Sequence, residues 1–542
     1  MRIKLKNNKN TLFYFLMMAL MFVVFAVTRL WKNDIMPNGL HIDEAAIAYD
    51  AWSLVNYGVD RHLKSWPVYL INFGGGQNVL YCYILAGLFK LFGFSFNLIR
   101  VPAVIFSFLT LMFGMLLVGK LFHDRSVLSL AAGSLVIICP YFIMASRFGL
   151  ESSLMVGMST VFLYCLVCAI DSARYRWYIL SGITGGLVLY TYAIAYVALP
   201  IFLMLTLIYT IRMRRFSFPR WLGLAIPMGI LAFPLILEQY INAFDLEEIH
   251  LGIFTVTKLT MYRLSEMGLP NWHKFANALY SIFIGDNLAY NSIPGFANLY
   301  RVTVPLVMIG VLHALIHLIR SWKKREATLL VYPFFWFLAM LVTLSCVIGS
   351  NTNKVNGIFF VVIFLAVEGI YALLEMGHWK RVAFEIDSEK DHRTLELQKM
   401  YWCKAAVAIC AGVYGIGFIR FGGYYFFGGY SNDYQELPYF DPAVTEAVAF
   451  LEENPEYRNE RTCIAENVIY LAISALPSPY DLRIDESYTL FLDYYYCGSL
   501  DAPEDGCNYI VRDIHPGYAQ MLRDLGYTEI DYGSHLLFYQ EE

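Results

Sequence analysis

The stretch LFYFLMMALMFVVFAVTRL, residues 12–30, indicates the class of protein to which this chain belongs. A run of this length and apolarity spans a bilayer as one helix. It is too long for a signal peptide and lacks a small-residue cleavage site. Basic residues precede it, namely Arg2, Lys4, Lys6 and Lys9. We therefore expect an uncleaved first span with the amino terminus in the cytoplasm.

The composition of the 542 residues extends this interpretation to most of the chain. Hydrophobic residues make up 58% and charged residues 15%, and the mean hydropathy is +0.50, whereas soluble chains are about 25% charged. A water-soluble globular protein is therefore excluded, and a polytopic α-helical membrane protein is predicted. Further spans are expected near 98–119, 126–145, 152–170, 177–193, 195–211, 221–238, 301–320, 327–348, 355–374 and 404–421. The total is about eleven transmembrane helices.

The apolar segment 78–96 is the ambiguous one, because Lys90 interrupts it after a short run. If it does not span, every basic cluster falls on one side of the membrane, as the positive-inside rule requires. These clusters are Lys120/Arg125, Arg174/Arg176, Arg212/Arg214/Arg215/Arg220, Lys323/Lys324/Arg325 and Lys380/Arg381 to Lys404. We therefore interpret 78–96 as a helix that lies on the outer surface.

The tail, residues 424–542, differs from the membrane part in charge. It holds 22 of the 44 acidic residues and only 5 of the 40 basic ones, although the net charge of the whole chain is just −4. A helix start at Asp441–Pro442 and short β-like runs such as NYIVRD and HLLFYQ predict a small extracytoplasmic α/β domain. We place the membrane domain at 1–423 and this domain at 424–542.

The cysteines and the charge pattern restrict the functional classes. The ten cysteines show no metal-ligand spacing, and Cys165/Cys168, inside a span, suit packing better than redox chemistry. In an extracytoplasmic tail, Cys497 and Cys507 are candidates for a disulfide that leaves Cys463 over. No basic run resembles a nucleic-acid footprint, so nucleic-acid binding is not expected.

The first extracytoplasmic loop opens with HIDEAAIAYDAWSLVNYGVD, residues 41–60. Apolar residues recur there at helical spacing and Gly58 suits a helix stop, so an amphipathic helix is predicted directly after the first span. Asp43 stands at its start and has two possible roles, helix N-cap or catalytic base. Glu44 is either a first-turn acid that complements the helix dipole or a second functional carboxylate.

Three further outer loops carry polar residues that are candidates for a binding site. Arg147 and Glu151 face each other if the next helix already includes both of them. Lys354 precedes an apolar helix at an outer end, where a lone cation opposes the positive-inside bias and favours an anionic neighbour such as a lipid phosphate. Asn356 accompanies it, and the third loop contributes Asp286. His250 and His273 lack metal-ligand spacing.

The order of these features resembles the GT-C membrane glycosyltransferases. The likeness is to the bacterial branch of glycosyltransferase family 39, kin to the protein O-mannosyltransferases and the lipid A aminoarabinose transferase. It covers about residues 1–421. The stretches that carry it are HIDEAAIAYDAWSLVNYGVD at 41–60, PVYL at 67–70, KLFGFSFNLIRVPA at 90–103, SRFGLES at 146–152 and NTNKVNGIFF at 351–360.

The resemblance implies an inverting transfer of a sugar from a polyprenyl-phosphate donor to an acceptor hydroxyl on a glycan, lipid or protein at the outer face of the membrane. In this role Asp43 is the general base, and Glu44 helps to position a substrate. Lys354 and Arg147 stabilise the lipid phosphate that leaves, and the other outer polar residues, Glu151, Asn356 and Asp286, contribute to substrate binding. No metal or other cofactor is predicted, although oligosaccharyl relatives of the wider fold use a divalent metal.

A transporter or flippase of lipid-linked sugars is the alternative interpretation. Such a protein is expected to carry charges at mid-membrane and internal repeats. The notable charges of this chain cluster at the outer ends of the spans, and no repeat is evident. The pattern therefore favours the enzyme.

Overall fold

The structure is a computed structural model of the chain. The described residues are 8–33, 35–37, 39–72, 75–122, 126–259, 261, 266–286, 292–293, 295–376, 389–431, 443–457, 459, 461–464, 469, 472–473, 476–483, 490–491, 494–496, 503, 506–512, 516–533 and 535–540.

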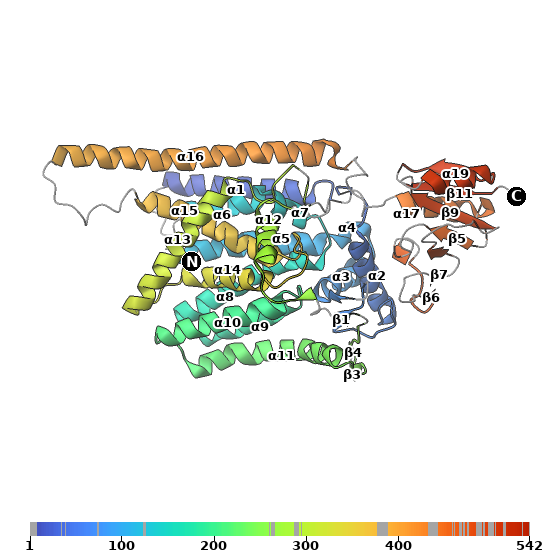
Figure 1. The fold of residues 1–542 in the computed structure, drawn as a ribbon, viewed down its shortest axis with the longest axis horizontal. Helices are drawn as coiled ribbons and strands as arrows, with labels where there is room; N and C mark the ends of the chain where they lie inside the picture. The colour runs from blue at the N-terminus through green and yellow to red at the C-terminus, as the bar shows by residue number, and fades with distance from the viewer. Residues whose placement is uncertain are drawn as a thin grey trace.

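A bundle of apolar helices forms the membrane domain (Figure 1). Eight helical segments in the described ranges are long and apolar enough to cross a membrane, so the chain is a multi-pass membrane protein. They comprise α1 (Asn8–Leu30), α4 and α5 (Phe96–Ile99, Val101–Leu121), α8 (Leu154–Ser172), α10 (Ala195–Arg212), α11 (Phe218–Ala243), α13 (Thr303–Lys324), α15 (Phe359–Met376) and α16 (Glu389–Phe427).

Shorter helices occupy the remaining expected spans. These are α6 (Ser126–Ile138) with α7 (Pro140–Ala145), α9 (Tyr175–Leu189) and α14 (Val331–Leu344). The expected span 126–145 is broken because Pro140 begins a new helix behind the extended residue Cys139. Every expected span thus contains a helix, while the total of eleven crossings stays a prediction.

Burial separates the inner helices of the bundle from the outer ones. The apolar windows of α8 and α15 are 89% and 83% buried, against 17% for that of α16. Two glycines let α13 and α15 pack closely, since a Cβ on Gly310 or Gly369 would lie about 2 Å from a backbone oxygen of the other helix. Small residues at helix crossings are the usual means of packing inside membranes.

One end of the bundle, called here the loop end, carries the short outer elements (Figure 1). They include α2 (Ile42–Tyr57), the hairpin β1–β2 (Tyr69–Leu70, Gln77–Asn78), α3 (Leu80–Phe92) and the hairpin β3–β4 (Ile249–Leu251, Phe254–Val256). α12 (Trp272–Phe283) packs against α14. α3 corresponds to the segment that was expected to lie on the surface. It has 13 residues and packs against α2.

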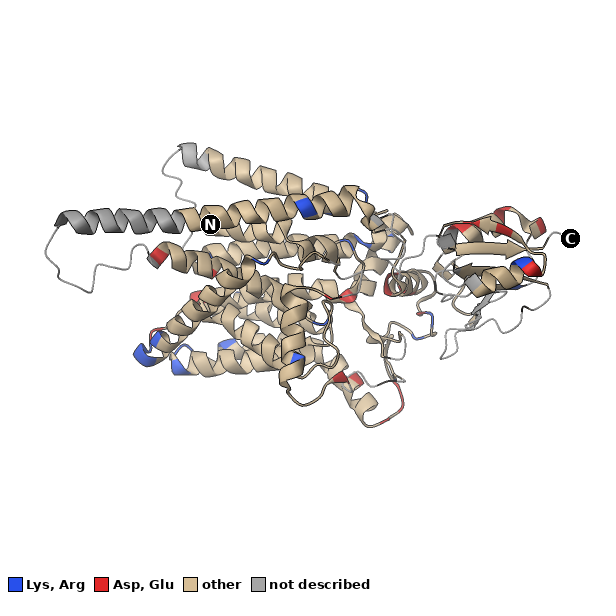
Figure 2. Cartoon of the chain, turned by 45° about the horizontal axis from the view of Figure 1, so that its top comes forward, with Lys and Arg blue, Asp and Glu red and all other residues tan. Residues whose placement is uncertain are grey.

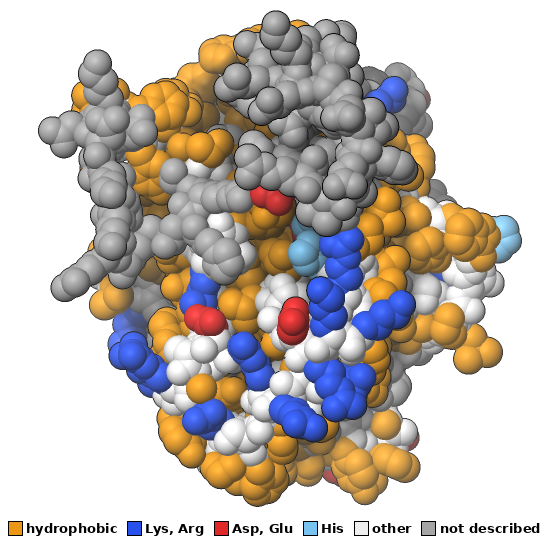
Figure 3. Space-filling model, turned by 90° about the vertical axis from the view of Figure 1, so that its left-hand side faces the viewer, with side chains coloured by type: hydrophobic (Ala, Val, Ile, Leu, Met, Phe, Trp, Pro, Cys, Tyr) orange, Lys and Arg blue, Asp and Glu red, His pale blue; other side chains and the backbone are white. Residues whose placement is uncertain are grey.

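The opposite end, called here the basic end, carries a cluster of Lys and Arg (Figures 2 and 3). The turn between α10 and α11 and the last turn of α13 contribute to it, and Arg212 donates to the carbonyl of Trp322 at 3.3 Å. The basic clusters that the structure describes therefore gather on one side, as the charge pattern predicts. Which side faces the cytoplasm stays a prediction.

A small mixed domain follows α16 (Figure 1). Its seven-stranded sheet has the order β10-β11-β9-β5-β8-β7-β6, and β5 runs parallel to β8 and β9. The elements are α17 (Ala443–Glu453), β5 (Arg461–Ile464), β6 (Leu482–Arg483), β7 (Leu490–Phe491), β8 (Tyr494–Tyr496), β9 (Cys507–Arg512), α19 (Pro516–Asp524), β10 (Thr528–Asp531) and β11 (His535–Tyr539). The predicted α/β domain is thus present, with apolar side chains of the central strands in its core.

Three details of the tail bear on the predictions. Cys463 is disulfide-bonded, whereas Cys507 is a buried thiol. The candidate disulfide between Cys497 and Cys507 is therefore not formed. Cys497 and the expected helix start at Asp441–Pro442 lie outside the described residues. α16 continues to Phe427, and the domain boundary at 423/424 stays a prediction.

Candidate functional site

The start of α2 determines where its two adjacent acids point. His41 is the N-cap, because its side chain accepts from the backbone N–H of Asp43, and the Glu44 side chain accepts from the backbone N–H of His41. Together they form a capping box. The interpretation of Asp43 as the helix cap is therefore wrong, and its carboxylate is available for other contacts.

The Asp43 side chain is 28% exposed and is held by Asn72, which follows β1. The Asn72 side-chain amide donates to Asp43 Oδ1 at 2.8 Å, and its carbonyl oxygen accepts from Arg61 at 2.7 Å. Because both ends of this amide are engaged, its orientation is fixed. One carboxylate oxygen of Asp43 is thus anchored while the side chain as a whole still reaches solvent.

Two buried acids lie behind this chain of hydrogen bonds. Asp50 lies 3.6 Å from Arg61, and Asp60 accepts from the backbone N–H groups of His62 and Lys64. Burial raises the pKa of Asp50 to about 6 and that of Asp60 to about 7, more than the neighbouring Arg61 and the backbone donors lower them. Burial also lowers the pKa of His41, although Asp43 and Glu44 act in the opposite direction.

Glu44, in contrast, is fully buried and has several partners. Arg100 donates to it from Nε at 2.9 Å and from Nη2 at 3.2 Å, and the backbone N–H of Gly149 donates at 2.5 Å. Arg100 also donates to the carbonyls of Asn33, Pro37 and Gly39. The pair therefore ties the start of α2 to the loop before it, to the start of α5 and to the second loop.

Arg147 is enclosed by carbonyl oxygens. Its guanidinium donates to the backbone carbonyls of Thr28, Trp31, Lys32 and Met36. The residues around it are not helical, since Leu150 is extended and a short 3-10 turn starts only at Glu151. The expectation that Arg147 and Glu151 face each other is therefore wrong, because it required a helix through both.

Glu151 holds the β1–β2 hairpin instead. Its carboxylate accepts from the backbone N–H of Asn78, whose side chain donates to the Tyr196 hydroxyl at 2.8 Å. Gly76 makes the tight turn possible, since its φ is +72° and a Cβ there would lie 2.5 Å from the carbonyl of Leu70. Through Asn72 and Asn78 the hairpin links Asp43 to Tyr196.

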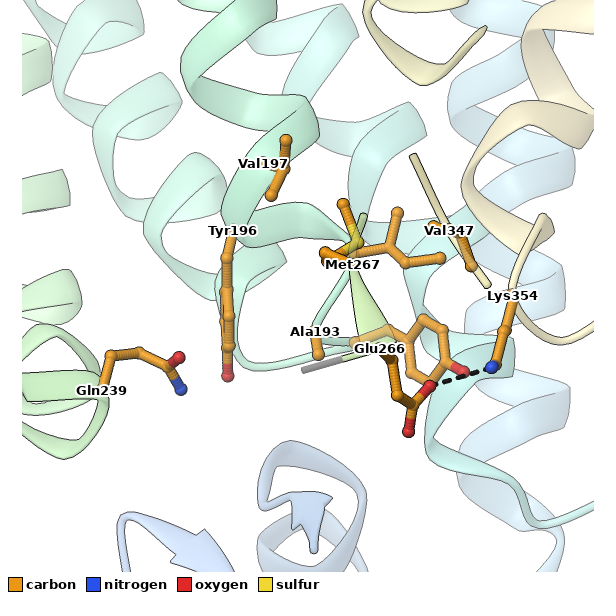
Figure 4. A pocket seen from close by; sticks show the side chains of 10 residues that line it. Ala193, Tyr196, Val197, Gln239, Glu266, Met267, Val347 and Lys354 are labelled. Carbon is orange, nitrogen blue, oxygen red and sulfur yellow. Dashed lines mark ion pairs between the residues drawn. The ribbon is translucent and has the colours of Figure 1, made fainter. Parts of the chain in front are cut away.

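Tyr196 lines a hollow at the loop end of the bundle, of about 450 Å³ including its open mouth. Lys354 lies in the wall and forms an ion pair with Glu266, with 2.8 Å between Nζ and Oε2. Figure 4 shows this pair across the hollow from Tyr196 and Gln239. Lys354 thus has an anionic neighbour within the chain, and its side chain stays 20% exposed.

A smaller hollow adjoins the same loop before α15. It is lined by uncharged side chains, including Asn353, Asn356 and Ser153. The Asn356 carbonyl oxygen accepts from the Tyr141 hydroxyl at 2.6 Å. Asp286 accepts from the backbone N–H of Thr352 at 2.6 Å and therefore fastens the third loop to this one. In the part of the chain that the structure describes, no group of three His, Cys, Asp or Glu side chains is suited to hold a metal ion.

The structure therefore distributes the predicted residues over three neighbouring places. Asp43 lies at the start of α2, Lys354 in the larger hollow and Asn356 in the smaller one, whereas Glu44 and Arg147 are enclosed in the scaffold. Sequence reasoning missed Arg100, Arg61 and Asn72. Arg100 had a usable signal, since an arginine between the apolar runs FNLI and VPA at an outer span end is expected to be paired.

Comparisons with known proteins agree with this architecture. Residues 77–237 match the family model described as dolichyl-phosphate-mannose-protein mannosyltransferase. The crystal structure of ArnT from Cupriavidus metallidurans bound to undecaprenyl phosphate is similar over 98% of both chains, with a TM-score of 0.54 and 12% sequence identity. The fold is that of the GT-C membrane glycosyltransferases. The apo state of the same ArnT gives a TM-score of 0.53 over the same coverage, again at 12% identity.

Two further comparisons gave a partial structural match and no sequence match. The cryo-EM structure of the arabinosyltransferase EmbB from Mycobacterium smegmatis matches 76% of this chain and 41% of its own, with a TM-score of 0.42 and 12% identity. No curated protein sequence matches the chain. The family model starts at β2 and ends in α11, so it covers Glu151, while Asp43 and Lys354 lie outside the matched range.

Proposed function

We propose that this chain is an inverting glycosyltransferase that transfers a sugar from a polyprenyl-phosphate donor to an acceptor hydroxyl. The observation that carries the proposal is Asp43, a carboxylate that is partly exposed and oriented by Asn72 at the loop end of a GT-C fold. The similar ArnT was crystallised with undecaprenyl phosphate. That ligand supports the class of donor.

Asp43 acts as the general base in this proposal. An acceptor hydroxyl is a weak nucleophile until a carboxylate within hydrogen-bond distance takes its proton during attack on the anomeric carbon. The hydrogen bond from Asn72 occupies Oδ1, and the acceptor is bound at Oδ2, which lies 3.6 Å from Nδ1 of His41. Positioning of this kind reduces the entropic cost of reaching the reactive geometry.

Lys354 stabilises the leaving phosphate. As the anomeric bond breaks, negative charge develops on the lipid phosphate, and a cation already in place lowers the energy of that state. The hollow beside Lys354 has an apolar wall formed by Val197, Met267 and Val347, among others, which suits the lipid side of the donor. The amide and hydroxyl groups of Gln239 and Tyr196 suit a neutral sugar.

The other predicted residues receive supporting roles. Glu44 and Arg147 fix the loops around the site, since both are buried and fully engaged by other protein groups. Glu151 fixes the hairpin, and Asp286 fixes the third loop against the fourth. Asn356, in the smaller hollow, is the one of this group that we retain as a binding residue for a neutral part of the substrate.

The reaction takes place at the outer face of the membrane in this proposal. Two observations support the orientation: the Lys/Arg cluster at the basic end, which the positive-inside rule assigns to the cytoplasm, and the disulfide-bonded Cys463 in the tail, which fits an oxidising compartment. The amino terminus is then cytoplasmic and the C-terminal domain extracytoplasmic. The acceptor, whether glycan, lipid or protein, would meet Asp43 from that side.

A flippase of lipid-linked sugars is the second candidate, and one observation favours it. Glu368 is fully buried within the candidate span of α15. His313 of the neighbouring α13 lies 2.9 Å from its carboxylate, and His317 lies 3.2 Å from His313. Ionisable groups inside spans are common in transporters. The glycosyltransferase mechanism proposed above gives these three side chains no role.

Sugar transfer from radiolabelled polyprenyl-phosphate sugars in detergent distinguishes the two functions. We expect transfer by the intact protein and a fall in kcat of at least about 100-fold in Asp43→Asn, with little change in KM for the donor. Asp245→Asn, which alters an exposed acid after α11, serves as the matched control. Full activity of Asp43→Asn would refute Asp43 as the base, and absence of transfer from every carrier would favour the flippase.

A further inference from the structure

The ion pair between Lys354 and Glu266 raises a question that sugar transfer alone leaves open. Of the ten described residues that line the larger hollow, Lys354 is the only cation and Glu266 the only anion. A carboxylate in contact with the single cation repels any second anion that approaches the same ammonium group. A phosphate can therefore bind Lys354 fully only if Glu266 leaves it.

The backbone holds Glu266 beside Lys354. The backbone N–H of Ile348 donates to the carbonyl of Glu266 at 3.0 Å, and that of Gly268 donates to Cys346 at 2.8 Å. Met267 and Val347 form an antiparallel bridge between them. The carboxylate is thus presented to the hollow by a paired segment, and its position does not depend on a chance contact of two surface side chains.

Lys354 is oriented from its own side as well. Its Nζ donates to the carbonyl of Ile348 at 3.0 Å, and the Asn351 side chain accepts from its backbone N–H at 2.9 Å. The ammonium group is therefore held at the hollow independently of Glu266. It can exchange one anionic partner for another without losing its position, because the carbonyl contact remains.

The two partners differ in how easily they leave the contact. The Glu266 side chain is 37% exposed and the Lys354 side chain 20%, so solvent can accommodate the displaced carboxylate. An ion pair this exposed contributes little stability. A ligand with a stronger charge and several oxygens, such as a phosphate, can displace it.

We propose that Glu266 is a built-in substitute for the donor phosphate. It occupies Lys354 while the hollow is empty, is displaced when a polyprenyl phosphate binds, and returns to displace the lipid phosphate after transfer. The exchange sets the affinity for the carrier and limits inhibition by the released carrier. This inference rests on the proposed function, since it assigns a regulatory role to the same phosphate site.

Binding of undecaprenyl phosphate to the full-length protein in detergent tests the exchange. We expect Glu266→Gln to tighten binding about tenfold, because the repulsive charge is removed while the side-chain shape is kept. Lys354→Met is expected to weaken binding. In that background Glu266→Gln should bring no gain, because the cation for which the Glu266 carboxylate and the lipid phosphate compete is absent. Undecaprenol, which lacks the phosphate, should bind equally to all variants.

Glu248→Gln is the matched control, since Glu248 forms a similar 2.7 Å ion pair with Lys64 outside the hollow. It should leave binding unchanged, and thermal unfolding of every variant shows whether it is folded. Inorganic phosphate is added as a competitor. Samples of Glu266→Gln and wild type are compared at the same fraction of bound lipid. If a lower phosphate concentration displaces the lipid from Glu266→Gln, then the phosphate group by itself competes with Glu266 for Lys354.

Several outcomes would overturn the proposal: unchanged or weaker binding to folded Glu266→Gln, an equal gain in the Lys354→Met background, or no binding by the wild type. Sugar transfer with an unchanged affinity of Glu266→Gln would refute the exchange and leave the enzyme intact. Tighter binding by Glu266→Gln without any sugar transfer would support the exchange and refute the enzyme.

Discussion

The buried pair of Glu44 and Arg100 offers the sharpest test of how the loop end is held together. Arg100→Met removes the guanidinium and leaves the Glu44 carboxylate, which is fully buried, with the backbone N–H groups of His41 and Gly149. Loss of one partner from a buried ion pair costs about 3–5 kcal/mol. The carbonyls that Arg100 also contacts each lose a donor worth about 1 kcal/mol. The sum over the ion pair and the three carbonyls is a loss of about 6–8 kcal/mol in the free energy of unfolding.

The assay is unfolding of the purified protein by SDS titration in mixed micelles, with the free energy taken from the midpoint and slope. Glu44→Gln and the double variant with Arg100→Met complete a mutant cycle. We expect the double variant to be more stable than the sum of the single losses by about 2 kcal/mol or more, because it no longer buries an unpaired charge. Lys64→Met, which breaks an ion pair of partly exposed side chains, should cost at most about 1 kcal/mol.

Two results would refute this reasoning. One is a loss of under 1 kcal/mol in Arg100→Met, which would mean that water or another group solvates Glu44. The other is strict additivity of the two substitutions, which would mean that the carboxylate and the guanidinium do not interact. Either result would reopen Glu44 as a group that is available to the substrate.

Three further predictions concern the surroundings of Asp43. Asn72→Ala should lower kcat about tenfold and leave KM for the donor nearly unchanged, because it frees Asp43 without removing it. It should also lower the melting temperature, because the buried Arg61 guanidinium loses an acceptor; an unchanged kcat in the folded variant would rule out a positioning role. Asp60→Asn should remove part of the pH dependence of stability: burial raises its pKa from 3.8 to about 7, so the folded state keeps a proton that the unfolded chain loses, and wild-type stability falls as pH rises from about 4 to 7. Melting temperatures at pH 5 and pH 8 test this, and the gain of the variant over the wild type should be clearly larger at pH 8 than at pH 5. Gly76→Ala should lower activity and cost at least about 1 kcal/mol of stability, since its φ of +72° and the nearby Leu70 carbonyl exclude a Cβ; full activity would show that the hairpin tolerates a different turn.

Much of the membrane fold could be predicted because it depends on local apolarity. Each expected span contains a helix. The short run before Lys90 and the placement of basic residues predict a surface helix at 78–96, where α3 forms, and its position relative to the membrane stays a prediction. The helix at 42–57 and its stop at Gly58 also follow from local spacing. The number of crossings does not follow from local apolarity in the same way, because short helices such as α14 depend on their neighbours for burial.

The site was harder to predict because its contacts join residues far apart in the chain. Glu44 meets Arg100 and Gly149, and Lys354 meets Glu266. In each pair several helices lie between the partners along the chain. The sequence indicated that Arg147 and Glu151 are neighbours on a helix, and the absence of that helix separates them. Pairings of this kind depend on tertiary structure, so residue spacing carries no signal for them.

The division of roles between Asp43 and Glu44 follows from helix geometry once one contact is known. Successive residues on an α-helix are rotated by about 100°, so the side chains of two adjacent acids point in different directions. The capping box fixes Glu44 against the backbone of His41 and beside Arg100, while Asp43 points toward Asn72 with Oδ1 and keeps Oδ2 at 3.6 Å from Nδ1 of His41. His41 therefore sets the rotational register of both acids. A substitution such as His41→Ala, which removes the cap acceptor, should disturb the orientation of Asp43 although His41 need not touch a substrate, and the two acids would then lose their separate environments together.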